Sequence, residues 1–277
     1  MTSSTTTWIN GKNADTVSAA DRGFNYGDGV FETVRVVNGE LTLWSYHRSR
    51  LANSCGQFGI VLDIELLEKE IQQAIVSLSQ PTVIKIIVTR GVGGRGYMPP
   101  TQGETTRVIT IHEAPQYPAE YANQGIKAHV CEVRISSNSS LAGIKHLNRL
   151  EQVLASHELA NTNFVEGLML DERGRVIEGI RTNLFIVKHN TLITPDLSRS
   201  GVAGVMRRVI LDDLAPTLGI KTEVASIDIN MVFDADELFF CNSVNGIWPV
   251  NRIDSHTFTV GGITRRLQKE VNQILHL

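Results

Sequence analysis

The strongest constraint on the fold is a series of short apolar strands joined by two-residue turns. Asn10-Gly11, Asn38-Gly39 and His189-Asn190 each separate two such strands. Turns of this kind favour tight hairpins, whose strands are antiparallel. The expected helices (residues 47–58, 64–78, 204–218 and 263–275) fall between groups of hairpins. This order predicts an α+β fold with antiparallel or mixed sheets rather than a doubly wound parallel sheet.

One segment is typical of a linker between domains. Residues 113–125 contain two prolines and little apolar periodicity. We therefore expect a small N-terminal domain over residues 1–114, a linker over 115–124, and a larger C-terminal domain over 125–277 that carries Lys145.

The composition excludes several classes of partner and site. The 277 residues carry a formal net charge of −3, which gives no reason to expect nucleic acid or an anionic membrane as a partner. No apolar run is long enough to span a bilayer, and the first residues lack the features of a secretory signal. Cys55, Cys131 and Cys241 form an odd set without paired spacing, so we expect reduced thiols, a cytoplasmic protein and no metal site.

A glycine-rich stretch between two expected strands matches a nucleotide-binding pattern. Gly91, Gly93 and Gly96 fit GxGxxG, and Glu113 follows at about the distance of a ribose-binding acid. In a dinucleotide site the third glycine opens a helix, but Pro99 and Pro100 follow here and argue against one. We therefore predict a loop that brings Arg95 and Tyr97 over a pocket. A non-catalytic or nucleotide-binding protein that uses GVGGRG remains an alternative from a different class.

The stretch 141–155, LAGIKHLNRLEQVLA, places Lys145 after a polar loop. Apolar residues recur at helical spacing from Leu147 onward, so a helix is expected to begin near His146. At that junction the Lys145 ammonium could point into a cleft. The ordinary alternative is a solvent-exposed lysine, and only partners elsewhere in the chain distinguish the two.

Those partners are a carboxylate and a set of anion-binding groups. Glu178 lies in VIEGIRTNLF, and Arg48 lies in YHRSRL at a helix start. The segment GVAGV opens a helix, which leaves the amides of Val205 and Met206 free to bind an anion. Ser243 follows an apolar strand in CNSVNG. Each residue alone has an ordinary reading, but together they are the set that a pyridoxal phosphate site needs: a lysine, a carboxylate for the pyridine nitrogen, and phosphate donors.

With these residues present together, the chain resembles the fold-type IV pyridoxal phosphate enzymes. This group includes branched-chain and D-amino acid aminotransferases and the aminodeoxychorismate lyases. The resemblance covers nearly the whole chain through DRGFNYGDGVFET, the Lys145 loop, VIEGIRTNLF, GVAGVMRR and CNSVNGIWPV. It implies a small N-terminal α/β sandwich, a larger C-terminal domain with a barrel-like mixed sheet, and a homodimer. The segments RGVGGRGY and LAGIKHLNRLEQVL resemble the versions found in the lyases.

The resemblance also implies a role for each site residue. Lys145 would hold the cofactor covalently and act as acid and base, and Glu178 would pair with the pyridine nitrogen. The phosphate would be held by Arg48, Val205, Met206 and Ser243, with Asn148 near the cofactor. Phe31, Arg95 and Tyr97 would line the substrate pocket, where Arg35 is a further cation for a substrate carboxylate.

The implied reaction converts 4-amino-4-deoxychorismate to 4-aminobenzoate and pyruvate, a step towards folate. A D-amino acid or branched-chain aminotransferase of the same fold is the alternative.

Overall fold

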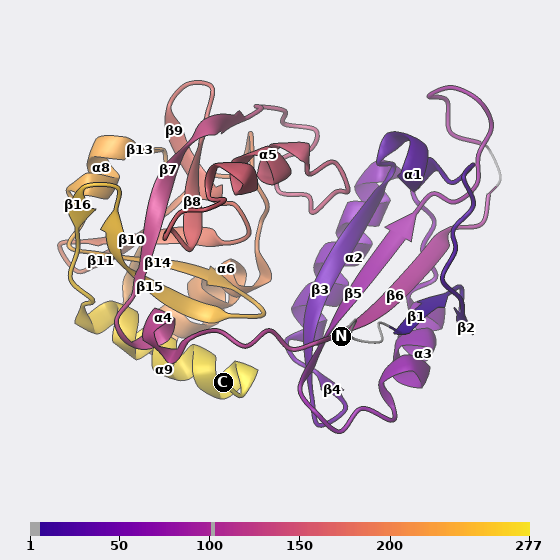
Figure 1. Cartoon of the computed structure of the whole chain (residues 1–277), viewed down its shortest axis with the longest axis horizontal. Coiled ribbons are helices and arrows are strands. Elements are labelled where there is room, and N and C mark those ends of the chain that lie inside the picture. The colour runs from indigo at the N-terminus through magenta and orange to yellow at the C-terminus, as the bar shows by residue number, and fades with distance from the viewer. Residues whose placement is uncertain (1–5, 101–102) are drawn as a thin grey trace. The chain divides into compact units, whose positions relative to one another are not determined.

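The computed structural model describes residues 6–100 and 103–277, which form two compact units (Figure 1). The first unit is Met1–Pro115 together with Lys145–Asn148, and the second is Gln116–Ile144 with Arg149–Leu277. This division differs from the predicted one chiefly at Lys145–Asn148, which group with the first unit because their backbone pairs with one of its strands.

The first unit is built on a six-stranded antiparallel sheet with the order β2-β1-β6-β5-β3-β4. Its strands are β1 (Thr6–Ile9), β2 (Lys12–Asn13), β3 (Gly29–Val37), β4 (Glu40–Leu41), β5 (Thr82–Thr89) and β6 (Thr106–Glu113). The hairpins predicted at Asn10-Gly11 and Asn38-Gly39 are confirmed, with β1 paired to β2 and β3 paired to β4. Both asparagines adopt the positive φ that such turns require.

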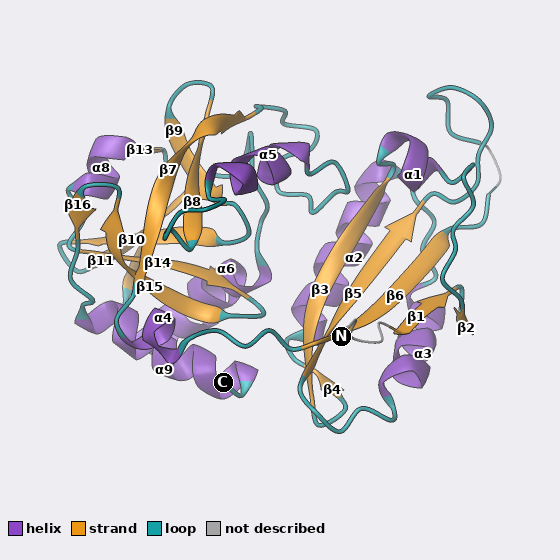
Figure 2. Cartoon of the chain, in the orientation of Figure 1, coloured by secondary structure: helices purple, strands orange, loops and turns teal. Residues whose placement is uncertain are grey.

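Two helices, α2 (Trp44–Phe58) and α3 (Ile64–Ile75), pack against the sheet of the first unit (Figure 2). Alternate residues of β3 and β5 are completely buried beneath them, including Val34, Val36, Ile84 and Ile86. This period of two defines a helix-covered face and an opposite face of the sheet. Helix α2 begins at Trp44, three residues before the predicted start at residue 47.

The second unit contains a ten-stranded mixed sheet that is nearly closed like a barrel, as expected. The order is β12-β11-β10-β14-β15-β7-β8-β9-β13, and β16 pairs with β15. The parallel pairs are β11 with β12, β15 with β7, and β7 with β8. The strands are β7 (Ile126–Ile135), β8 (Glu166–Asp171), β9 (Arg175–Gly179), β10 (Asn183–Lys188), β11 (Thr191–Pro195), β12 (Lys221–Ala225), β13 (Ile227–Asp228), β14 (Glu237–Asn242), β15 (Gly246–Ile253) and β16 (His256–Thr257).

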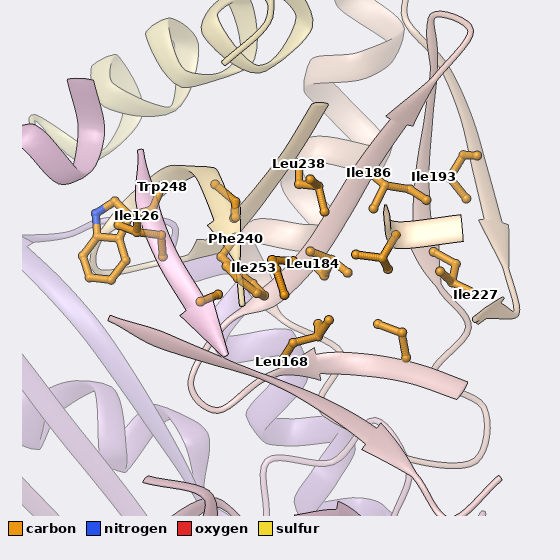
Figure 3. Packing of buried hydrophobic residues seen from close by; sticks show 14 of the residues in the cluster. Ile126, Leu168, Leu184, Ile186, Ile193, Ile227, Leu238, Phe240, Trp248 and Ile253 are labelled. Atoms are coloured by element: carbon orange, nitrogen blue, oxygen red, sulfur yellow. The ribbon is translucent and has the colours of Figure 1, made fainter. Parts of the chain in front are cut away.

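The core of the second unit lies inside this curved sheet. Figure 3 shows side chains from several strands gathered there, and the labelled members are each at least nine-tenths buried: Ile126, Leu168, Leu184, Ile186, Ile193, Ile227, Leu238, Phe240, Trp248 and Ile253. Burial of aliphatic and aromatic area on this scale is the main force that holds the sheet closed.

Helices cover the outside of the second sheet. The closing helix α9 (Gly262–Leu275) packs on β14 and β15 through Leu267, Val271 and Leu275, which recur at helical spacing. The helical run expected over residues 204–218 is present as α6 (Val205–Val209), a π-helical turn (Ile210–Leu214) and α7 (Ala215–Thr217). Pro216 lacks an amide proton, so the regular helical hydrogen bonding is interrupted at this point.

The linker predicted over residues 115–124 contains a short helix, α4 (Ala119–Asn123), which packs on β15. One predicted helix start is wrong. The helix expected from His146 begins only at Leu150, as α5 (Leu150–Glu158), because the preceding backbone pairs with β3. In the second unit α5 packs on β7 through Ala155, while Leu150, Val153 and Leu154 stay exposed.

Candidate active site

Lys145 is fixed to strand β3 by its own backbone. The Phe31 amide donates to the Lys145 carbonyl over 2.9 Å, and the Leu147 amide donates to the Gly29 carbonyl over 3.0 Å. The Lys145 ammonium lies 4.3 Å from the centre of the Phe31 ring, within the range of a cation–π contact. A lysine expected at a loop-to-helix junction is therefore held in a strand-like segment beside an aromatic residue.

A buried polar network stands behind β3, on the helix-covered face of its sheet. Glu32 is 1% exposed, accepts a hydrogen bond from His47 over 2.7 Å, and pairs with Arg50 over 2.5 Å. Burial alone would raise the Glu32 pKa, but Arg50 and His47 more than offset it and lower the pKa to about 2. Glu32 is thus an ionised carboxylate that holds Arg50 in place.

His47 completes this network as a neutral imidazole. Complete burial lowers its pKa, an effect to which the charges of Arg50 and Lys145 add and which Glu32 opposes. Among the described residues, no group forms a hydrogen bond with its buried Nε2 atom. The influence of Lys145 on this imidazole places Glu32, His47 and Arg50 in the electrostatic neighbourhood of the lysine. Sequence reasoning missed these three residues.

The predicted phosphate residue Arg48 lies elsewhere on α2. It pairs with Glu68 of α3 over 2.8 Å, and its side chain is 44% exposed. Because residues two apart on a helix point about 200° apart, Arg50 is directed to Glu32 while Arg48 remains at the surface. The Arg50 side chain is only 13% exposed. Of these two arginines, Arg50 belongs to the network whose His47 is influenced by the charge of Lys145.

Three other predicted residues of the first unit, Phe31, Arg35 and Asn148, lie on β3 or next to it. Phe31 and Arg35 stand on the same face of β3, and Arg35 is 7% exposed, with a pKa lowered by burial. Asn148 donates from Nδ2 to the Gly27 carbonyl over 3.3 Å. A Cβ atom at Gly27 would lie 2.2 Å from Asn148 Oδ1, so a glycine is required for this close approach.

The glycine-rich loop is fastened by Arg22 of helix α1 (Arg22–Tyr26). The Arg22 guanidinium donates to the carbonyls of Gly96 (3.0 Å) and Tyr97 (2.9 Å) and pairs with Asp28 over 2.8 Å. Among the described residues between Gly96 and strand β6, which are 97–100 and 103–105, none is helical, and this argues against the dinucleotide-binding geometry. Arg95 and Tyr97 are exposed, and the Tyr97 ring meets Tyr26 edge-on at 5.6 Å. The loop therefore presents both predicted pocket residues outward.

In the second unit, Glu178 lies against a glycine-containing loop. It is 4% exposed on β9, and its Oε2 accepts a hydrogen bond from the Val202 amide over 2.8 Å. The Val202 carbonyl accepts in turn from Asn183 Nδ2 over 2.9 Å. Gly201 has φ +82°, and a Cβ atom there would lie 3.2 Å from Glu178 Oε2. The 201–204 loop thus passes tightly between Glu178 and Asn183.

The same loop opens α6 without a side-chain cap. Gly204 is the N-cap residue, and a Cβ atom there would lie 1.8 Å from Asn183 Oδ1. The first amides of a helix, here those of Val205 and Met206, have no partners within the helix. An uncapped helix start that is free of side chains suits an anion such as a phosphate.

Two further residues of the second unit, Ser243 and Arg149, are relevant to the candidate site. Ser243 stands in the turn between β14 and β15, which Asn242 shapes by accepting from the amides of Val244 (2.9 Å) and Asn245 (2.7 Å). Arg149 donates to the Ile144 carbonyl over 3.1 Å and lies within electrostatic reach of Glu178. Burial lowers the Arg149 pKa, and the Glu178 charge opposes that effect.

The residues present fit pyridoxal phosphate. Glu178 is a buried carboxylate for the pyridine nitrogen, the 201–206 segment is a glycine cradle that a Cβ atom would fill, and Lys145 is a primary amine held by its backbone. Residues 6–100 and 103–277 contain no cluster of three His, Cys, Asp or Glu side chains able to hold a metal ion. Within those same ranges no helix is long and apolar enough to cross a membrane.

Comparisons with known proteins agree with this geometry. A family model described as amino-transferase class IV matches residues 29–253. Aminodeoxychorismate lyase of Vibrio harveyi is 38% identical over 275 residues, covering 96% of this chain and 99% of the lyase. A putative branched-chain-amino-acid aminotransferase of Methanocaldococcus jannaschii is 33% identical, covering 96% of this chain and 95% of that protein.

A comparison with solved structures supports the same family. The crystal structure of 4-amino-4-deoxychorismate lyase from Pseudomonas aeruginosa superposes with a TM-score of 0.93 and 42% sequence identity, over 96% of this chain and 98% of that one. The predicted family resemblance is thereby confirmed. The chain belongs to the amino-transferase class IV family of pyridoxal phosphate-dependent enzymes.

Proposed function

We propose that this enzyme converts 4-amino-4-deoxychorismate to 4-aminobenzoate and pyruvate, a step towards folate. The observation that carries the proposal is the likeness to two aminodeoxychorismate lyases at 38% and 42% identity over nearly the whole chain. The cofactor residues alone do not separate this reaction from transamination, because both need a lysine, a carboxylate and phosphate donors.

The following residues would hold the cofactor. Lys145 anchors it covalently, Glu178 pairs with its pyridine nitrogen, and the amides of Val205 and Met206 with the Ser243 hydroxyl donate to its phosphate. We assign the cation of the phosphate site to Arg50 in place of Arg48, because Arg50 is largely buried and pairs with Glu32, while Arg48 is paired at the surface. Asn148, three residues after Lys145 in the same segment, would lie near the cofactor.

When bound, the cofactor withdraws electrons from the substrate carbon that bears the amine and so makes its C–H bond acidic. The Lys145 amine takes that proton as general base. The bond between the neighbouring ring carbon and the enolpyruvyl oxygen then breaks, and the ring becomes aromatic. Lys145 returns a proton to the departing enolpyruvate, which leaves as pyruvate. One lysine thus serves both proton transfers, and no oxidant or second substrate is needed.

The substrate carries two carboxylates, so cations should surround it. Arg35 on β3 and Arg95 on the glycine-rich loop are the proposed partners, with Phe31 and Tyr97 lining the pocket. Arg22 supports this assignment, because its hydrogen bonds to Gly96 and Tyr97 hold the backbone on either side of these loop side chains.

An aminotransferase acting on D- or branched-chain amino acids is the second candidate, which the M. jannaschii relative favours. One assay distinguishes the lyase activity from the aminotransferase activity. The lyase should release 4-aminobenzoate and pyruvate from 4-amino-4-deoxychorismate without any keto acid. Conversion of an amino acid only when a keto acid is present, with no 4-aminobenzoate formed, would establish the aminotransferase instead.

We further propose that the enzyme is a cytoplasmic homodimer. The resemblance to fold-type IV enzymes supports the dimer, and three buried free cysteines whose pKa values burial raises to about 12 suit a reducing compartment. Sedimentation should give twice the chain mass of 30.6 kDa. A fully active species of single-chain mass would refute the dimer.

A further inference from the structure

The glycine-rich motif is shaped around one arginine side chain. The Arg22 side chain is only 4% exposed, and its guanidinium donates to the carbonyls of Gly96 and Tyr97 over 3.0 and 2.9 Å. Its backbone amide donates to the Gly91 carbonyl over 2.9 Å. A Cβ atom at Gly93 would lie 2.5 Å from Arg22 Cδ, so a glycine there leaves room for the arginine. The motif therefore accommodates an arginine of its own unit.

Asp28 holds that arginine in place. Its Oδ2 accepts from Arg22 Nε over 2.8 Å, and its two oxygens accept from Arg90 over 2.7 and 3.0 Å. Burial alone would raise the Asp28 pKa, but the hydrogen bonds and charges of Arg90 and Arg22 more than offset it and lower the pKa. One ionised carboxylate, with a side chain that is 15% exposed, therefore binds two arginines.

Arg90 ties this carboxylate to the end of helix α2. It donates to the carbonyls of Phe58 and Gly59 over 2.7 and 2.8 Å, where a helix leaves its last carbonyls without partners of its own. Its backbone amide also donates to the Asp28 carbonyl over 3.1 Å. The loop is thus connected through Arg22, Asp28 and Arg90 to a helix that packs on the sheet of the first unit.

We propose that Asp28 is a positioning residue for the substrate loop and acts through Arg22. This inference rests on the proposed lyase function, in which Arg95 and Tyr97 meet the substrate. Both of these side chains are exposed, so their placement depends on the backbone that carries them. Arg22 fastens that backbone at two carbonyls, and Asp28 fixes the direction of Arg22. A binding group fixed in advance lowers the entropy that substrate binding costs, so the effect falls on the KM.

The test measures loop opening and kinetics in the cofactor-loaded enzyme. Trypsin cleaves after arginine, and Arg95 is exposed, so the rate of cleavage at this bond reports how often the loop opens. In Asp28→Asn both the cleavage rate and the KM should rise about tenfold, the effect of one charge-assisted hydrogen bond. The kcat and the cofactor content should stay within about twofold of wild type.

Glu70→Gln is the matched control. Glu70 is also buried and forms a bidentate pair with Arg107, over 2.7 and 2.8 Å, that involves neither Arg22 nor Asp28. A general loss of stability in the first unit would therefore affect both variants alike, whereas loss of the loop contact would affect Asp28→Asn alone. Equal increases in cleavage rate and KM in the two variants would overturn the inference.

A double-mutant cycle tests whether Asp28 acts through Arg22. If it does, Asp28→Asn combined with Arg22→Met should have the same cleavage rate and KM as Arg22→Met alone. Additive effects would overturn the inference, and so would a wild-type cleavage rate or KM in Asp28→Asn.

If Asp28→Asn does not fold, Arg22→Lys takes its place, because it keeps the charge beside Asp28 but loses the fork that reaches two carbonyls. Its cleavage rate and KM should rise together, and a wild-type value of either would overturn the inference. A wild type that releases no 4-aminobenzoate would instead refute the proposed function. The cleavage rates do not depend on the reaction, so the two failures are distinguishable.

Discussion

The Lys145 ammonium lies over the Phe31 ring while the backbones of the same two residues are joined by a hydrogen bond of 2.9 Å. One residue of β3 therefore fixes both the main chain and the side chain of the lysine. A lysine restrained in this way loses little entropy when it reacts, which favours a covalent anchor.

The first prediction concerns that anchor. The purified protein should be yellow, and reduction with borohydride followed by peptide mapping should place the cofactor on Lys145. The bound lysine must be a primary amine beside the other cofactor groups, and Lys145 is the lysine to which the proposed site gives this place. Labelling of Lys85 or Lys127 in its place would contradict the assignment.

Arg50 and Arg48 give a second, paired prediction. Arg50→Lys keeps the charge beside Glu32 but loses the planar fork that suits a phosphate. The dissociation constant for the cofactor should rise about 10- to 100-fold, the worth of a charge-assisted hydrogen bond. Arg48→Ala should change cofactor affinity less than about twofold, because exposed ion pairs contribute little. Equilibrium titration with the cofactor measures both dissociation constants. A larger loss of affinity in Arg48→Ala than in Arg50→Lys would instead make Arg48 the phosphate residue.

These two arginines show where sequence reasoning reached its limit. Local pattern predicted a helix over residues 47–58, which lies within α2 (Trp44–Phe58), but it cannot say which of two arginines on a helix faces the sheet. Arg50 faces the sheet because it pairs with Glu32 of β3, which also bonds His47, and these contacts form only when β3 packs on α2. The prediction of a helix from His146 was wrong for a similar reason. His146 pairs with Val30, more than a hundred residues earlier, and this pairing overrides the local helical pattern. Hairpins with two-residue turns were predictable because their signals are entirely local.

A third prediction tests the carboxylate of the second unit. Glu178→Gln keeps an oxygen to accept from the Val202 amide, so the 201–204 loop and the phosphate contacts should persist. The loss of negative charge removes the group that keeps the pyridine nitrogen protonated. Turnover should fall by about 100-fold or more, while cofactor content measured by absorbance stays close to the wild-type value. Near-normal turnover would show that another group serves the pyridine nitrogen.

The buried network behind β3 gives a pH-dependent prediction. The Glu32 pKa is lowered from 4.5 to about 2 in the folded protein. Its contribution to stability is therefore present above about pH 4.5 and is lost as the pH falls towards 2. The free energy of unfolding should be several kcal/mol lower in Glu32→Gln near pH 7, and this difference should shrink steadily below pH 4.5.

Urea titrations at several pH values measure that difference. Glu68→Gln is the control, because its partner Arg48 is exposed and its effect should stay within about 1 kcal/mol at every pH. A Glu32→Gln difference that does not depend on pH would mean that this carboxylate is not ionised in the folded state.

The central claim is that Lys145 carries out elimination rather than transamination. Its neighbour His146 is the nearest competing base, but backbone pairing with β3 makes the segment strand-like, so adjacent side chains point to opposite sides. The decisive measurement is the release of 4-aminobenzoate and pyruvate from 4-amino-4-deoxychorismate, without a keto acid, by wild type, Lys145→Ala and His146→Ala. We predict release of both products by the wild type, none by Lys145→Ala, and substantial activity in His146→Ala. Partial activity in Lys145→Ala together with an inactive His146→Ala would contradict the account.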